Sequence, residues 1–132
     1  MENLMLNKPN IEEYCEGEFK DYLLELVKRD LKSVPESTHC RRRDIASAIL
    51  AVNKEVGERE RTKQELCKLI PKITFNNLQE GKLSKLGFKV IKGKGHYKVA
   101  WHDSPYRVTF SATPSDFRFP DKLKIDLTRI FF

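Results

Sequence analysis

The sequence predicts an α+β fold in which N-terminal helices precede a three-stranded antiparallel meander, and a C-terminal helix completes the order α-β-β-β-α. Two observations predict this class. Apolar residues recur at helical spacing along residues 11–86, and the spacing changes to every second residue between residues 88 and 110. Helical spacing then returns over residues 121–132. A chain of 132 residues is long enough to bury one core.

The first predicted helix covers residues 11–32. Its apolar stripe has one member in every four residues: Ile11, Cys15, Phe19, Leu23, Val27 and Leu31. Pro35 ends this helix, because a proline disfavours helical backbone in the residue before it. We therefore predict a boundary at Ser37 between an acidic N-terminal amphipathic helix (1–37) and a basic α+β domain (38–132).

Two shorter helices are predicted next. Asp44 is a suitable N-cap for a helix over residues 44–56, which the following glycine would end. Thr62 and Glu65 have the spacing of a reciprocal capping box, so a further helix is expected over residues 62–69.

Another helix is predicted on each side of the strands. Thr74 can cap a helix over residues 74–86. Pro120 suits the first position of the C-terminal helix. The inward residues of that last helix are expected to be Leu123, Leu127 and Ile130 or Phe131.

Three strands are predicted from the alternation of apolar and polar residues. The apolar positions, which we expect to face the core, are Phe88, Val90, Tyr97, Val99, Trp101, Tyr106, Val108 and Phe110. Gly93 and Gly95 form the first turn, and residues 103–105 form the second. The short connections predict an antiparallel meander.

Charge is divided unevenly along the chain. The whole sequence carries 25 Lys and Arg against 19 Asp and Glu, a net charge of +6. Residues 1–37 hold five basic and nine acidic residues, whereas residues 38–132 hold twenty basic and ten acidic residues. The basic part predicts a polyanionic partner, RNA or DNA. The acidic helix 11–32 leaves open a protein partner or self-association.

Other features of the composition narrow the class of protein. The three cysteines are widely spaced and form no C-x-x-C pair, so neither a disulfide framework nor a metal site is expected. Residues 1–14 lack the apolar core of a signal peptide, and no apolar run reaches the length of a membrane span. We expect a reduced, cytoplasmic protein with no membrane contact and no cofactor.

A cationic surface is expected on one side of the sheet. If the apolar residues face the core, His96, Lys98, Arg107 and Thr109 face outward together, because residues two apart on a strand point the same way. Lys92 and Lys94 are expected on the adjoining turn. Such a surface suits a phosphate backbone. An exposed sheet face is also polar for reasons of solubility alone.

Two further basic segments are candidate nucleic-acid contacts. One is a run of three arginines, Arg41, Arg42 and Arg43, just before a predicted helix start. Cations are unfavourable at a helix N-terminus, so a phosphate or acidic partner is one explanation for their presence there. Arg118 lies between two phenylalanines, a pattern found where aromatic side chains stack on bases. The alternatives are a solvated linker and a loop whose aromatic residues fill the core.

Residues 74–131 resemble the HicA-type toxins, which are small relatives of the double-stranded-RNA-binding domain. The hallmark of that family is a Gly-Phe strand start followed by a Gly-Ser-His element. Here Gly-Phe stands at 87–88 and Gly-Lys-Gly-His at 93–96. The resemblance implies a metal-independent ribonuclease in which His96 is the catalytic residue. The sequence departs from the family where Lys94 and Gly95 replace Gly-Ser, and in the segment 113–122.

A winged helix is the competing resemblance. The predicted helices 44–56, 62–69 and 74–86 followed by a hairpin match its order, and the glycine turn would be the wing tip. The residues that would then face DNA are Asn76, Asn77, Gln79, Lys82 and Lys85. The sheet-centred interpretation is preferred, because the alternation runs through all three strands.

Catalysis is left open, and the residues themselves argue for binding. Histidine suits acid–base chemistry near neutral pH. His102 is six residues beyond His96, roughly 20 Å along a continuous strand, too far for both to act on one phosphate. His39 stands in a linker. The favoured function is therefore nucleic-acid binding by backbone contact, and the alternative is a protein-interaction or assembly subunit that docks through helix 11–32.

Overall fold

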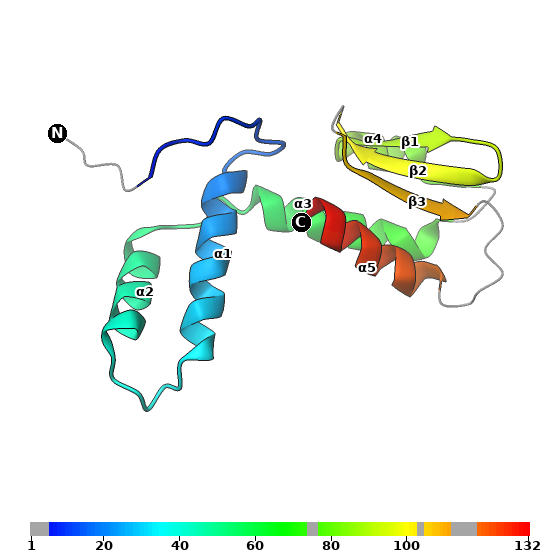
Figure 1. Ribbon diagram of the computed structural model, residues 1–132. Coiled ribbons are helices and arrows are strands. Elements are labelled where there is room, and N and C mark those ends of the chain that lie inside the picture. The colour runs from blue at the N-terminus through cyan, green and yellow to red at the C-terminus, as the bar shows by residue number, and fades with distance from the viewer. Residues whose placement is uncertain (1–5, 74–76, 103–104, 112–118) are drawn as a thin grey trace.

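The computed structural model describes residues 6–73, 77–102, 105–111 and 119–132 (Figure 1). The fold is α+β, as the sequence predicts. Its elements are α1 (Glu18–Ser33), α2 (Arg41–Val52), α3 (Glu58–Leu69), the 3-10 turn η1 (Ile70–Lys72), α4 (Glu80–Lys85), β1 (Phe88–Lys92), β2 (His96–Trp101), β3 (Arg107–Ser111) and α5 (Phe119–Phe131).

The three strands form an antiparallel meander in the order β1-β2-β3, which confirms the predicted topology. The register pairs Val90 of β1 with Val99 of β2, and Val99 with Val108 of β3. The first turn spans residues 93–95, as expected. Gly95 there has φ +77°, a left-handed conformation that glycine adopts without steric cost.

One face of the sheet packs against the helices and forms the core. Its strand residues are Phe88, Val99, Trp101 and Val108, with Val90, Tyr97 and Phe110 partly buried beside them. Trp101 is 1% exposed and stacks on Phe88 with 5.4 Å between ring centroids. These positions confirm the predicted alternation, except that Tyr106 precedes β3 and is exposed.

Helices α3, α4 and α5 supply the other side of this core. Leu66 of α3, Leu83 of α4, and Leu123 and Leu127 of α5 are buried in it. Phe131, rather than the exposed Ile130, completes the inward face of α5. The inward residues predicted for the C-terminal helix are therefore confirmed.

The first helix is shorter than predicted. Residues 11–17 are not helical, and α1 begins at Glu18 after Gly17, whose φ is +73°. A Cβ on Gly17 would lie 2.3 Å from Val56 Cγ2, so the chain there passes close to the α2–α3 connection. Leu24 is buried, whereas Leu23 of the predicted stripe is exposed.

The starts of α2 and α3 also differ from the prediction. Helix α2 begins at Arg41 rather than Asp44, with Cys40 at the N-cap position. Helix α3 begins at Glu58, so Thr62 is a buried mid-helix residue and not a cap. Gly57, with φ +95°, makes the turn into α3.

The fourth helix is only six residues long. Gln79 precedes it in a left-handed conformation, and residues 77–79 are not helical. The predicted helix over residues 74–86, which would be the groove-reading helix of a winged helix, is therefore wrong over 77–79. Thr74 and Asn76 lie outside the described residues.

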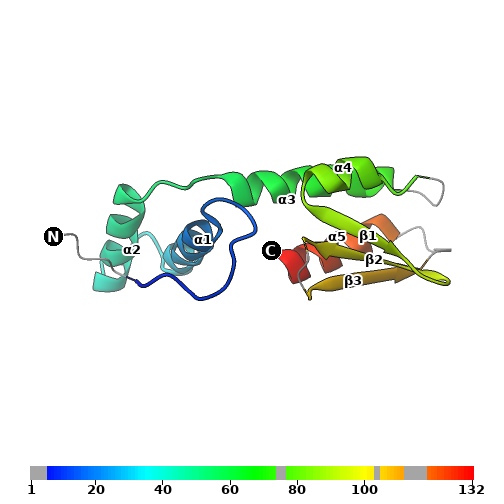
Figure 2. The ribbon, with the colours of Figure 1, turned by 90° about the horizontal axis from the view of Figure 1, so that it is seen from above.

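Helices α1 and α2 form a hairpin that lies to one side of the sheet (Figures 1 and 2). The predicted boundary at Ser37 falls in the turn between these two packed helices. In the described part of the chain, no helix is long and apolar enough to cross a lipid bilayer.

Candidate nucleic-acid interface

The sheet face opposite the core carries a group of basic and polar side chains, which we call the basic sheet face. The register arranges them in rows across the strands. The members are Lys89 and Ile91 of β1, His96, Lys98 and Ala100 of β2, Arg107 and Thr109 of β3, and Lys94 on the turn between β1 and β2.

Lys98 occupies the middle of this face. It pairs with Ile91 on one side and with Thr109 on the other. In the next row Ala100 is flanked by Lys89 and Arg107. Ala100 is 1% exposed, whereas both flanking side chains are exposed. The stems of these two long side chains lie on either side of Ala100.

Several cations of the helices form ion pairs with neighbouring carboxylates. The pairs include Arg29 with Glu25, Arg42 with Asp30, Arg61 with Glu58, Lys68 with Glu65, and Arg129 with Asp126. The three strands contribute no carboxylate to the basic sheet face, and within the described residues Lys94, His96 and Lys98 form no ion pair.

Lys92 does not belong to this face, contrary to the prediction that it lies on the turn. It is the last residue of β1 and shares the side of Val90, which faces the helices. Its Nζ lies 2.9 Å from Glu80 Oε1 at the start of α4. The hydrogen bond from Lys92 and the charge of Glu80 raise the pKa of this lysine.

The arginines of residues 41–43 lie in α2 and not beside the sheet. They form the first turn of that helix, rather than preceding a helix as predicted. Arg42 Nε donates to Asp30 Oδ1 at 2.9 Å, and Arg43 donates to the carbonyl oxygen of Val34 at 3.1 Å. Both side chains therefore connect α2 with α1. Arg118 lies outside the described residues.

The histidines are dispersed over the fold. His96 is exposed at the start of β2, where its Cα pairs with that of Ser111. His102 follows the other end of β2, and its Nε2 lies 3.1 Å from the carbonyl oxygen of Tyr14. His39 Nε2 lies 3.3 Å from Asp44 Oδ2 on α2. The described residues contain no cluster of three metal-ligating side chains.

Lys89 is a member of the basic sheet face that was not among the predicted site residues. The sequence does indicate an outward side chain at Lys89, because this residue alternates with the inward residues Phe88 and Val90. What the sequence could not supply was the register, which places Lys89 two positions across the sheet from Arg107. Cross-strand neighbours are not encoded by spacing within one strand.

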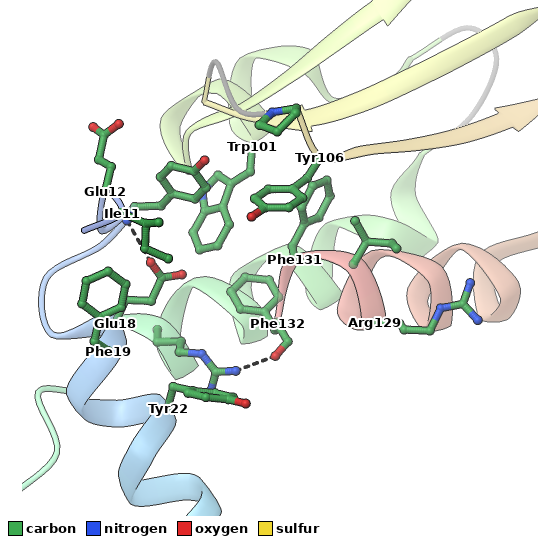
Figure 3. Close-up of a pocket in the computed structure, with 14 residues that line it drawn as sticks. Ile11, Glu12, Glu18, Phe19, Tyr22, Trp101, Tyr106, Arg129, Phe131 and Phe132 are labelled. Carbon is green, nitrogen blue, oxygen red and sulfur yellow. Dashed lines mark hydrogen bonds between the residues drawn. The ribbon is translucent and has the colours of Figure 1, made fainter. Parts of the chain in front are cut away.

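A hollow lies between α1, the segment before it, and the ends of β2 and α5 (Figure 3). Its volume is about 720 Å³, and its walls carry the rings of Tyr14, Phe19, Tyr22, Trp101, Tyr106, Phe131 and Phe132. Two of its charged side chains bond within the protein. Glu18 Oε1 accepts from the backbone N–H of Tyr14 at 2.9 Å, and Arg59 bonds to Glu25 and to the carbonyl oxygen of Phe132. These bonds link the N-terminal part of the chain to its C-terminal end.

Comparison with protein-family models, with curated proteins and with solved structures found no match.

Proposed function

We propose that this protein binds the phosphate backbone of RNA or DNA through the basic sheet face. The single observation that carries the proposal is that this face gathers cations without any carboxylate. Its strand residues include no Asp or Glu, and Lys94 and Lys98 form no ion pair within the described residues. An anion can therefore bind these lysines without first displacing an internal partner.

The rigidity of the support favours this function. Lys98 is on the central strand, and the residue beside it, Val99, is buried in the core. Side chains of the face that are two apart on a strand are separated by roughly 7 Å. The cations are thus held at defined separations, which suits recognition of a backbone by shape and charge rather than by sequence. His96 and Thr109 can add hydrogen bonds to phosphate or sugar oxygens.

The test is equilibrium binding of labelled, mixed-sequence RNA and DNA duplexes, followed by fluorescence anisotropy. The four Lys and Arg side chains of the face are Lys89, Lys94, Lys98 and Arg107. About four phosphate contacts give a salt slope near −3.6, so affinity should fall roughly 150-fold between about 50 mM and about 200 mM salt. Comparison of the two duplexes distinguishes RNA from DNA.

Two lysines of the same hairpin provide a matched pair of variants. Lys98→Gln removes a cation from the basic sheet face and should reduce the magnitude of the salt slope by about 0.9. Lys92→Gln makes the same change on the helix side of the sheet and should leave the slope unaltered. The proposal fails if the protein binds neither duplex at low salt, or if both variants weaken binding equally.

A further inference from the structure

The hollow beside α1 is lined mainly by aromatic rings (Figure 3). We call it the aromatic hollow, and its rings are those of Tyr14, Phe19, Tyr22, Trp101, Tyr106, Phe131 and Phe132. Its volume of about 720 Å³ lies within the range of small-molecule sites, roughly 300–1,000 Å³. The ring plane of Tyr14 is turned by 67° from that of Trp101 and by 70° from that of Tyr106. Rings therefore border the hollow on more than one side.

The charged side chains of the aromatic hollow leave an excess of negative charge. The described residues that line it include two carboxylates, Glu12 and Glu18, and two cations, Arg59 and Arg129. Each of the two arginines forms an ion pair with a carboxylate that does not line the hollow. Within the described part of the chain, neither Glu12 nor Glu18 forms an ion pair. The hollow therefore complements a positive charge, although the chain as a whole carries +6.

Glu18 is the carboxylate that the fold directs at the rings. It is the first residue of α1, and its Oε1 accepts a hydrogen bond from the backbone N–H of Tyr14 at 2.9 Å. In Figure 3 its carboxylate points toward the hollow, whereas that of Glu12 points away from it. The pKa of the nearby Cys15 thiol is raised to about 11, by burial first and by the charges of Glu18 and Glu58 next. The negative potential of Glu18 thus reaches the side chains around it.

A carboxylate beside aromatic rings favours an organic cation as ligand. The face of an aromatic ring attracts a cation through the ring quadrupole, most strongly at tryptophan and where water is excluded. One such contact already exists in the hollow, where the guanidinium carbon of Arg59 lies 5.5 Å from the centre of the Tyr22 ring. An anion would be repelled by Glu18. A neutral ligand would remove water from Glu18 without pairing its charge.

We propose that the aromatic hollow binds a small organic cation, in which an alkylated ammonium group is attached to an apolar body. Glu18 is its counter-ion, and the rings of Trp101 and Tyr106 contact the ammonium group. The hollow is larger than an ammonium group alone, so the apolar body occupies the rest of it. Trp101 faces the core, whereas Lys98 of the basic sheet face lies on the opposite side of the sheet. The site is therefore independent of nucleic-acid binding.

The experiment is titration of the full chain with organic cations, followed by tryptophan fluorescence. Trp101 is the only tryptophan in the sequence and it lines the hollow, so the signal reports on this site. The probes are benzyltrimethylammonium, choline and the uncharged analogue of choline in which a tert-butyl group replaces the trimethylammonium group. Choline should bind roughly tenfold more tightly than its uncharged analogue, which has the same shape. Benzyltrimethylammonium should bind more tightly than choline, because its ring occupies more of the hollow.

Glu18→Gln removes the counter-ion and retains an oxygen that can accept from the N–H of Tyr14. It should weaken binding of benzyltrimethylammonium about fivefold. The matched control is Glu16→Gln, since Glu16 is exposed on the same segment and does not line the hollow; it should bind as the wild type does. Tyr106→Leu is a second disrupting variant. It removes an exposed ring of the hollow and should also weaken binding of the cation.

Circular dichroism of each variant checks that the helices are retained. The proposal is overturned if neither cation binds, or if choline and its uncharged analogue bind equally well. An affinity for benzyltrimethylammonium that Glu18→Gln leaves unchanged also overturns it, because the charge of Glu18 would then have no role. The last arm uses a peptide that carries trimethyllysine. Weaker binding of this peptide than of benzyltrimethylammonium supports a small molecule as the ligand, and tighter binding overturns that assignment in favour of a protein side chain.

Discussion

The carboxylate of Asp21 accepts a hydrogen bond from the backbone N–H of Gly57 at 2.8 Å, across 36 residues of sequence. Its other oxygen accepts from the N–H of Val56 at 2.9 Å. Asp21 is a buried residue of α1, and Gly57 is the residue from which α3 starts. One acidic side chain therefore joins the helical hairpin to the part of the chain that carries the sheet.

Asp21→Ala should destabilise the protein by about 1–3 kcal/mol, because two backbone N–H groups lose their partner in a buried position. Urea denaturation followed by circular dichroism measures the loss. Asp44→Ala is the control, since Asp44 is exposed on α2 and contacts only His39 among the polar partners described for it. Equal losses for the two variants would contradict the anchoring role of Asp21.

Gly87 is expected to tolerate a side chain poorly. Its φ is +90°, and an added Cβ would lie 2.8 Å from His102 Cε1. Gly95 has φ +77° but open space around the same position, so Gly95→Ala isolates the cost of the backbone conformation. We expect about 1 kcal/mol for Gly95→Ala and roughly 2 kcal/mol or more for Gly87→Ala in thermal or urea unfolding. A smaller effect at Gly87 than at Gly95 would refute the steric explanation.

The stability of the protein should depend on Glu25 at low pH. Burial alone would raise the pKa of Glu25, but the hydrogen bond and positive charge of Arg59 outweigh it, so the pKa is lowered from 4.5. A lowered carboxyl pKa contributes stability above the unfolded value, which is lost as pH falls through the folded value.

The wild type should therefore exceed Glu25→Gln in free energy of unfolding near pH 7, and the difference should shrink as pH drops below about 4.5. Arg59, whose side chain is buried, is the partner in this pair. Urea titrations of both proteins over that pH range provide the measurement. A difference that stays constant with pH would show that the Glu25 charge is not responsible.

His96 is expected to bind and not to cleave RNA. The structure places it with Lys98 on a face whose strands carry no carboxylate, and it places His39 and His102 in two other connecting segments, each with a partner of its own. Metal-independent cleavage needs both a base and an acid. Labelled RNA should stay intact with the wild type, and His96→Ala should weaken binding by a few-fold. Cleavage by the wild type that disappears in His96→Ala would instead establish the catalytic role that the toxin resemblance implies.

The strands and their inward faces were predictable because alternation is a local property. Val99 and Trp101 face the core because they lie two residues apart, and no distant residue is needed to decide it. The same rule correctly put His96 and Lys98 together on the opposite side. The same rule did not show that Lys92 lies outside the basic sheet face. The position of Lys92 depends on where β1 ends and on the salt bridge to Glu80, and both depend on where α4 packs.

Helix starts were less predictable, because contacts between distant residues decide them. Thr62 and Glu65 have the spacing of a cap, yet α3 begins four residues earlier, where Gly57 turns the chain and Asp21 holds its backbone. Local capping signals are worth about 1 kcal/mol, which a few tertiary contacts outweigh. Likewise the apolar stripe of residues 11–31 predicts one helix, whereas in the structure the helix begins only after Gly17, which lies close to Val56.

Sequence periodicity was thus sufficient for the α+β class, the meander and the polarity of its two faces, since each follows from which neighbours along one strand or helix are apolar. The packing of the elements decided three further features: the grouping of Lys89, Lys98 and Arg107 on one surface, the separation of Arg42 from it, and the exposure of apolar side chains on α1 and α2. Register and packing join residues that are far apart in the chain, and the physical forces that select them act between whole surfaces rather than along the sequence.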